Sequence, residues 1–184
     1  IIFTEETVYD SSVSLMQRDR NTDDIYISYS TPKTPSRTFI YNLKTKEKKL
    51  VKEQIIPSGH NLNDYIVERL ECEGHDGRII PITITRKKTT KLDGNSNLLL
   101  YGYGSYGNSM WPSFSSTRLS LINRDIIWAT AHVRGGMERG MKWWKEGKLL
   151  NKKNTFQDYI SCAKFLIDKK YTSKKKIVGM GGSA

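Results

Sequence analysis

The sequence has few cysteines, few histidines and a deficit of acidic side chains. Its 184 residues include two cysteines, three histidines and 19 acidic residues, against 30 lysines and arginines. Cys72 and Cys162 lie far apart and match no metal-ligand spacing, so we expect no metal site and a reducing, cytoplasmic compartment. We also expect no cofactor. No apolar run reaches transmembrane length, and the N-terminal segment carries acids instead of a basic signal region, so we expect no signal peptide and no membrane partner.

The excess of positive charge is uneven along the chain. The formal net charge is +11, and the stretch from Lys142 to Lys176 holds eleven lysines and three acidic residues, a net charge of +8. Such a patch attracts anions, but none of these cations is an arginine able to make bidentate contacts with bases or phosphates. A solvated helix face is therefore favoured and no nucleic-acid partner is expected. A basic, non-enzymatic binding module stays open as an alternative.

The first 57 residues read as antiparallel strands joined by turns. Residues 25–30 (IYISYS) and 38–43 (TFIYNL) alternate apolar and polar side chains, and the prolines of TPKTPS separate them. A polar turn over 44–49 leads to a short strand, KLVKE. Three or so strands do not bury a core by themselves. We therefore predict that residues 1–57 are the end of a larger β domain, of the sandwich or propeller type.

From residue 58 the pattern changes to an α/β arrangement. YIVERLEC and RIIPITITRKK flank Asp76-Gly77 and predict a hairpin whose second strand is half-buried. LLLY (98–101) and IIWATAHV (126–133) are compact apolar runs typical of parallel strands, and STRLSLINR between them fits one or two helical turns. KIVGM predicts a last strand. The order of elements indicates a layered α/β domain over 58–184.

Residues 154–170 (NTFQDYISCAKFLIDKK) form the strongest predicted helix. Asn154 fits the N-cap, with Gln157 three residues later for a capping-box contact. One apolar stripe at helical spacing is predicted to face the core. It consists of Phe156, Tyr159, Ile160, Ala163, Leu166 and Ile167.

The chain ends in GMGGSA, which supplies the first four positions of G-x-S-x-G. A serine nucleophile must be presented on a strained strand-to-helix turn, which very small neighbours permit. Gly181, Gly182 and Ala184 meet that demand around Ser183, directly after a predicted strand. The N–H of Ala184 would then point at the developing oxyanion.

A nucleotide site is the competing interpretation of the glycines. YGYGSYG contains G-x-G-x-x-G as Gly102, Gly104 and Gly107 after the strand LLLY. A dinucleotide site needs these glycines to open a helix, whereas NSMWPSFSS is poor helix material. Asp125 precedes its strand, although a ribose-binding acid belongs at the strand's end. The other alternative is a flexible aromatic loop.

HVRGGMERG (132–140) follows a buried strand. It fits a rim loop of a site, or a structural turn held by an Arg134–Glu138 pair, and the structural turn is favoured. His132, inside an apolar strand, is predicted to be a core residue and not a catalytic base. His60 and His75 lie in a linker and a hairpin turn, so no histidine is a convincing base.

The stretches LLLYGYGSYG, FSSTRLSLINRDIIWATAHVRGG and GKLLNKKNTFQDYISCAKFLIDKKYTSKKKIVGMGGSA together resemble the prolyl oligopeptidase family of serine peptidases, nearest to its oligopeptidase B (protease II) branch. The resemblance runs from about Tyr65 to Ala184. It implies the fold class: the N-terminal half of an α/β-hydrolase domain, preceded by the last antiparallel strands of a β-propeller.

The resemblance also implies roles for single residues. Ser183 matches the nucleophile, and Tyr103 matches the tyrosine that assists the N–H of Ala184 in the oxyanion hole. Tyr106 matches an aromatic position near the substrate pocket. Members of the family cleave short peptides, and the oligopeptidase B branch prefers to cut after Lys or Arg.

The family's triad Asp and His, and the acids that recognise a basic side chain, follow the nucleophile. We therefore expect this sequence to be a fragment of a cytoplasmic serine oligopeptidase that is inactive alone and is active only when completed by the half that carries the Asp and His. An inactive relic, and a split-gene subunit that assembles with a complementary C-terminal chain, stay open as alternatives.

Overall fold

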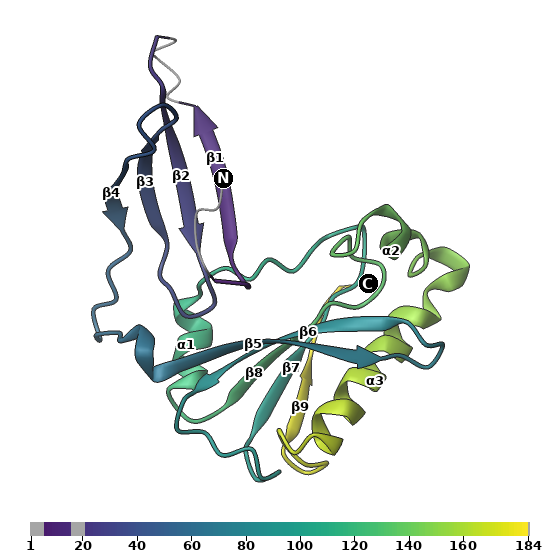
Figure 1. Cartoon of the computed structure of the whole chain (residues 1–184). Coiled ribbons are helices and arrows are strands. Elements are labelled where there is room, and N and C mark those ends of the chain that lie inside the picture. The colour runs from purple at the N-terminus through teal and green to yellow at the C-terminus, as the bar shows by residue number, and fades with distance from the viewer. Residues whose placement is uncertain (1–5, 16–20, 184) are drawn as a thin grey trace. The chain divides into compact units, whose positions relative to one another are not determined.

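The computed structural model describes residues 6–15 and 21–183. The chain divides into two compact units, each with its own sheet (Figure 1). The first comprises Ile1–Leu62 with Trp111–Ser116, and the second comprises Asn63–Met110 with Thr117–Ala184. The helices in the described part of the chain are too short or too polar to cross a bilayer. The assignment of residues 1–57 and 58–184 to a propeller and a hydrolase domain stays a prediction.

The first unit is a four-stranded antiparallel sheet in the order β1-β2-β3-β4. Its strands are Asp10–Leu15 (β1), Asp24–Ser30 (β2), Arg37–Asn42 (β3) and Lys48–Glu53 (β4). The strands expected from IYISYS, TFIYNL and KLVKE are confirmed. β1 was not predicted, because its sequence, DSSVSL, lacks an apolar face and its side chains are largely exposed.

The core of the first unit is small. Among the described residues, its core cluster comprises Ile25, Ile27 and Tyr41, and all six residues of β4 are exposed. This agrees with the expectation that such strands bury little apolar surface by themselves.

The second unit is a five-stranded mixed sheet in the order β5-β6-β8-β7-β9. Its strands are Tyr65–Glu73 (β5), Ile79–Lys87 (β6), Leu98–Tyr101 (β7), Ile127–Ala131 (β8) and Ile177–Met180 (β9). β5, β6 and β8 pair antiparallel, and β7 runs parallel to both β8 and β9. The hairpin, the parallel strands and the last strand were all predicted.

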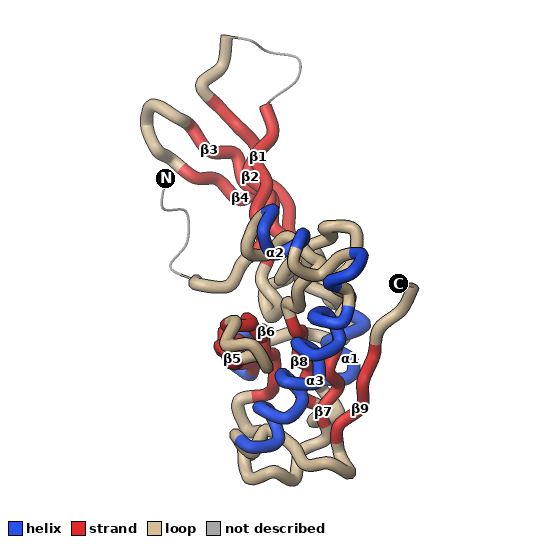
Figure 2. The backbone as a smooth tube through the Cα atoms, turned by 90° about the vertical axis from the view of Figure 1, so that its right-hand side faces the viewer, coloured by secondary structure: helices blue, strands red, loops and turns tan. Residues whose placement is uncertain are grey.

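Helices accompany this sheet (Figure 2). They are α1 (Ser116–Ile122), α2 (Met141–Lys145) and α3 (Lys153–Asp168), with single 3-10 turns at Leu62–Asp64 (η1) and Leu149–Asn151 (η2). Cys162 and Leu166 of α3 share one core cluster with residues of β6, β7 and β8, so α3 packs on a face of the sheet.

β6 is buried on both faces, contrary to the prediction of a half-buried strand. Ile80, Ile82 and Ile84 are fully buried, and Thr83 and Thr85 on the opposite face are buried too. Other segments cover side chains of β6 on both faces: Ile80, Ile82 and Ile84 share a core cluster with Cys162 and Leu166 of α3, and Thr83 contacts the buried His132. The threonine hydroxyls, polar in sequence, find partners within the protein; that of Thr83 contacts His132.

The face that α3 turns to the core matches the predicted stripe only in part: Leu166 is buried and Tyr159 and Ala163 pack against the core, as predicted. Thr155, Asp158, Cys162 and Leu166 are its buried residues, whereas Phe156 and Ile160 of the predicted stripe are exposed. The predicted cap is also wrong. Lys152 occupies the N-cap without a side-chain cap, and the amide of Asn154 donates to the carbonyl of Glu146. The buried Asp158 sets this rotation because it pairs with Arg134 inside the protein.

Candidate active site

Parallel pairing brings the two predicted site segments together. β7 and β9 pair in parallel, so their carboxyl ends lie next to each other at the same end of the sheet. The N–H of Gly102, directly after β7, donates to the carbonyl of Met180, the last residue of β9, at 3.1 Å. Tyr103 follows Gly102, and Ser183 lies three residues beyond Met180. The pairing therefore delivers both side chains to the same place.

Ser183 has a strained backbone. Its φ is 65°, in the left-handed region that a serine rarely adopts. Gly181 permits the approach to β7, because a Cβ there would lie 2.9 Å from the carbonyl oxygen of Gly102. Outliers of this kind gather at functional sites. Ala184, the predicted second oxyanion donor, lies outside the described residues.

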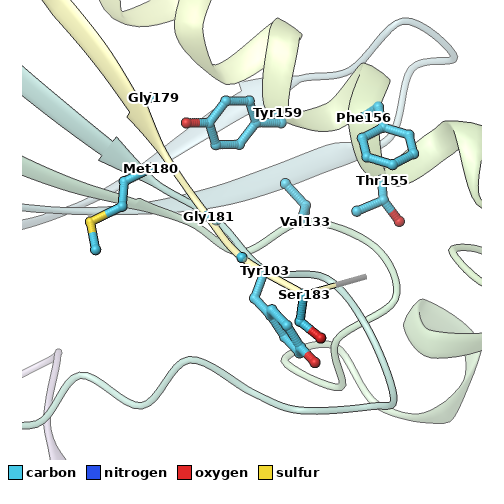
Figure 3. A pocket seen from close by; sticks show the side chains of 11 residues that line it. Tyr103, Val133, Thr155, Phe156, Tyr159, Gly179, Met180, Gly181 and Ser183 are labelled. Carbon is cyan, nitrogen blue, oxygen red and sulfur yellow. The ribbon is translucent and has the colours of Figure 1, made fainter.

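Tyr103 and Ser183 line one cavity of about 370 Å³. Figure 3 shows the Tyr103 ring and the Ser183 side chain at the end of the last strand. The complete lining is Gly102, Tyr103, Val133, Thr155, Phe156, Tyr159, Gly179, Met180, Gly181, Gly182 and Ser183. The cavity can accept a small group beside two hydroxyls, one of them on strained backbone. The catalytic roles of these residues stay predictions.

Tyr159 forms the wall of this cavity on the α3 side (Figure 3). Its hydroxyl donates to the carbonyl of Leu100 at 2.6 Å, and burial raises its pKa. A Cβ on Gly102 or on Gly179 would lie 2.7 or 2.9 Å from this side chain, so both glycines are required by its position. Sequence reasoning placed Tyr159 only in an apolar stripe and missed this contact with the strand.

Arg134 lies behind the cavity in a buried ionic network. It is 1% exposed, and its Nε and Nη2 donate to the two carboxylate oxygens of Asp158 at 2.8 and 2.5 Å. Its Nη1 donates to Asp76 at 2.6 Å. The predicted Arg134–Glu138 pair is therefore wrong. Burial alone would lower the pKa of Arg134, but hydrogen bonds to the two carboxylates raise it, and Arg134 in turn lowers the pKa of Asp76.

This network supports the cavity wall directly. The carbonyl of Arg134 accepts a hydrogen bond from the Thr155 hydroxyl at 2.7 Å, and Thr155 lines the cavity. Three glycines allow the backbones to meet here. A Cβ on Gly135 would lie 2.0 Å from the carbonyl oxygen of Gly104, and one on Gly147 would lie 2.2 Å from the nitrogen of Gly135.

His132 is a core residue, as predicted. It is 1% exposed, and its Nε2 lies 2.7 Å from the Thr83 hydroxyl. Its Nδ1 lies 3.5 Å from Glu138 Oε1, which also accepts the N–H of Met110 at 2.8 Å. Burial lowers the pKa of His132. Glu138 thus ties the loop after β7 to the loop after β8.

The three histidines have other contacts than the lining of the Ser183 cavity. His60 contacts the carbonyl of Lys33 and the ring of Phe114, and His75 lies beside Asp76. None of the three, all within the described residues, lines the cavity. No imidazole base for Ser183 is therefore found in the part of the chain that the structure describes.

Tyr106 does not line the Ser183 cavity. It is 75% exposed, has a φ of 56°, and lines a second cavity with residues from the segment between α2 and α3. Its role in substrate binding stays a prediction.

The nucleotide interpretation fails on geometry. Residues 108–115 form no helix, so the glycines of YGYGSYG do not open one. A Cβ on Gly104 would instead lie 2.4 Å from Thr155, so this glycine serves packing. Asp125 pairs with Lys87 at 3.4 Å.

Among the described residues, no group of three or more His, Cys, Asp or Glu side chains is placed to hold a metal ion.

Comparison with known proteins identifies related sequences and folds. The model of the prolyl oligopeptidase family matches residues 112–184. Dipeptidyl aminopeptidase BI of Pseudoxanthomonas mexicana is 40% identical over 98% of this chain and 25% of its own length. Protease 2 of Moraxella lacunata is 38% identical over 98% of this chain and 26% of its own length.

Solved structures give the same result. Oligopeptidase B from Trypanosoma brucei has a TM-score of 0.90 at 32% identity, covering 98% of this chain and 26% of its own. Oligopeptidase B from Leishmania major has a TM-score of 0.87 at 33% identity, and the match covers 98% of this chain and 25% of that protein. The predicted fold class, α/β-hydrolase strands preceded by propeller strands, is thus confirmed. The chain spans about a quarter of the length of the relatives it matches.

Proposed function

We propose that this chain carries the nucleophile of a serine peptidase, because it belongs to the prolyl oligopeptidase family. The observation that supports the proposal most is Ser183 itself. It sits at φ 65° after β9, in one cavity with the Tyr103 hydroxyl. A strained serine beside a phenol donor is the arrangement that acyl transfer requires.

In the proposed reaction, Ser183 Oγ attacks the scissile carbonyl of a short peptide while its proton passes to a base. Tyr103 donates a hydrogen bond to the resulting oxyanion, with the N–H of Ala184 as the second donor. The intermediate collapses to an acyl-enzyme and releases the amine, which takes the proton from the base. Water then hydrolyses the ester and restores Ser183.

The base and its orienting carboxylate are proposed to come from sequence outside these 184 residues. The reason lies inside the chain: His132 is buried against Thr83 and Glu138, and neither His60 nor His75 lines the cavity. A serine enzyme without its base keeps only a small residual rate. Cleavage after Lys or Arg would likewise depend on acids supplied from outside the chain.

The test is complementation. The chain is co-expressed with the segment that follows the nucleophile in protease 2 of Moraxella lacunata, and fluorophosphonate labelling and hydrolysis of a short fluorogenic peptide are measured. We expect labelling and turnover in the complex and neither in the chain alone. Ser183→Ala should abolish both, Ser173→Ala, at a half-buried serine that lines neither cavity, should change neither, and Tyr103→Phe should lower turnover about a hundredfold or more.

Two outcomes would contradict the proposal. Turnover that survives Ser183→Ala in the complex would rule out the assigned nucleophile. Turnover by the chain alone that Ser183→Ala abolishes would rule out the need for an external base. Salt-dependent retention on heparin, with no labelling in any complex, would favour the basic binding module.

A further inference from the structure

The second cavity lies beside the Ser183 cavity in the same unit. It has a volume of about 470 Å³ and is built from the loop after β7, from α2 and from the segment between α2 and α3. Its lining is Ser105, Tyr106, Trp144, Gly147, Lys148, Leu149 and Lys152. The cavity therefore combines two aromatic rings with two ammonium groups, and no carboxylate is part of its lining.

The two ammonium groups are held in place differently. Lys152 Nζ donates to the carbonyl of Gly104 at 2.8 Å and to the Ser105 hydroxyl at 2.5 Å, which fixes its position. Lys148 Nζ lies 3.6 Å from the centre of the Trp144 ring. A cation over an indole is attracted to the ring face. This contact holds the positive charge of Lys148 against Trp144, in the lining of the cavity.

Neighbouring carboxylates are engaged elsewhere. Glu146, next to Gly147, pairs with Arg78 at 2.7 Å and with Lys142 at 3.8 Å. Asp158 on the following helix is buried against Arg134. The positive charge at the mouth of the cavity is therefore not cancelled by either acid.

A hydrogen bond and a loop connect the linings of the two cavities. Thr155 lines the Ser183 cavity, and its hydroxyl donates at 3.2 Å to the carbonyl of Gly147, which lines the second cavity. Tyr103 and Ser105 of one loop line the first and the second cavity respectively. Two residues span at most about 7 Å, so a peptide of a few residues reaches both.

Resting on the proposed function, we propose that the second cavity is a subsite for a carboxylate-bearing residue of the peptide substrate. The carboxylate, from an acidic side chain or from the peptide's own C-terminus, pairs with Lys148 and Lys152. Tyr106 and Trp144 cover the apolar part of the same residue. A basic residue is disfavoured there, because it would face two like charges.

The test measures binding and not turnover. Fluorescence anisotropy is recorded for labelled Ala-Phe-Glu-Ala-amide on the chain, and for peptides with Gln or Lys in place of Glu. We expect the Glu peptide to bind about fivefold more tightly than the Gln peptide, the effect of one ion pair at a partly exposed site. The Lys peptide should bind most weakly. Matched peptides with a free or an amidated C-terminus identify which carboxylate the subsite prefers.

Variants separate the subsite from the general positive charge of the chain. Lys148→Met should remove the preference for Glu over Gln, and Lys148→Arg should retain it. Lys174→Met also removes one positive charge, but from a lysine that lines neither cavity, and it should leave the preference for Glu over Gln unchanged. An equal effect of Lys148→Met and Lys174→Met, no preference in the parent chain, or no peptide binding at all would each overturn the inference. None of these results decides the complementation test of Ser183, so the two proposals fail separately.

Discussion

At the scale of single residues, Arg134 joins three segments that are distant in sequence. It binds Asp76 in the β5–β6 turn and Asp158 on α3, and its own backbone follows β8. The N–H of Arg134 also donates to Asp158 at 3.0 Å. Asp158 is fully buried, so it depends on this single arginine for its counter-charge.

Replacing Arg134 should therefore destabilise the protein strongly. Arg134→Met leaves Asp158 as an uncompensated buried charge, and we expect the free energy of unfolding to fall by about 3–5 kcal/mol. Urea denaturation of the parent and variant chains measures the difference. Arg139→Met is the matched control, because Arg139 pairs with Glu71 at the surface and should cost less than about 1 kcal/mol. Equal effects of the two substitutions would contradict the central role of Arg134.

Residue-scale contacts were the hardest to predict from the sequence. Arg134 and Glu138 are four residues apart and carry opposite charges, so a local pair was the natural expectation. The actual partners of Arg134 are 58 and 24 residues away, and only the tertiary fold brings them together. The nearness of Tyr103 and Ser183 was expected only from the family resemblance, and the parallel pairing of β7 and β9 explains it.

At the scale of elements, α3 shows how one buried charge sets the orientation of a helix. The apolar side chains of α3 cover more than one face, so periodicity alone does not choose among them. Placing Asp158 against Arg134 turns Cys162 and Leu166 inward and leaves Phe156 and Ile160 at the surface. The existence and extent of the helix were predictable from its apolar period, but its rotation was not.

Two alanine substitutions within the predicted stripe test the observed orientation of α3, because one of the two side chains is buried and the other is exposed. Leu166→Ala removes a fully buried side chain and should lower the free energy of unfolding by about 2–5 kcal/mol. Ile160→Ala, at a side chain 43% exposed, should cost less than about 1 kcal/mol. Thermal or urea unfolding of both variants measures the two changes. If Ile160→Ala is as damaging as Leu166→Ala, the helix is rotated toward the predicted stripe.

At the scale of the whole molecule, the two units differ in how much apolar surface they bury. The second unit has a core cluster spanning β5 to β8 and α3, whereas the cluster found among the described residues of the first unit comprises only Ile25, Ile27 and Tyr41. The alternation along β2 and β3 and the compact runs of β7 and β8 made both sheets predictable. The short polar strand β1 escaped prediction because it contributes almost nothing to a core.

This contrast predicts an uneven pattern of hydrogen exchange. Amides of β6 and β8 lie inside the sheet of the second unit and should be the slowest to exchange. Amides of β1 and β4, with largely exposed side chains, should exchange fastest among the strands. Exchange monitored by mass spectrometry on peptic fragments gives the comparison. Protection of β4 equal to that of β6 would show that the first unit is held by contacts beyond its own small core.

The place of β9 has a practical consequence for handling the chain. In the described residues, β9 is the last strand of its sheet, and Val178 and Met180 on it are 62% and 49% exposed. A strand that has one unpaired edge and apolar side chains is a template for another copy to add to. Concentrated preparations of the chain should therefore aggregate through this strand, and a charged substitution at Val178 is the first change to make for solubility.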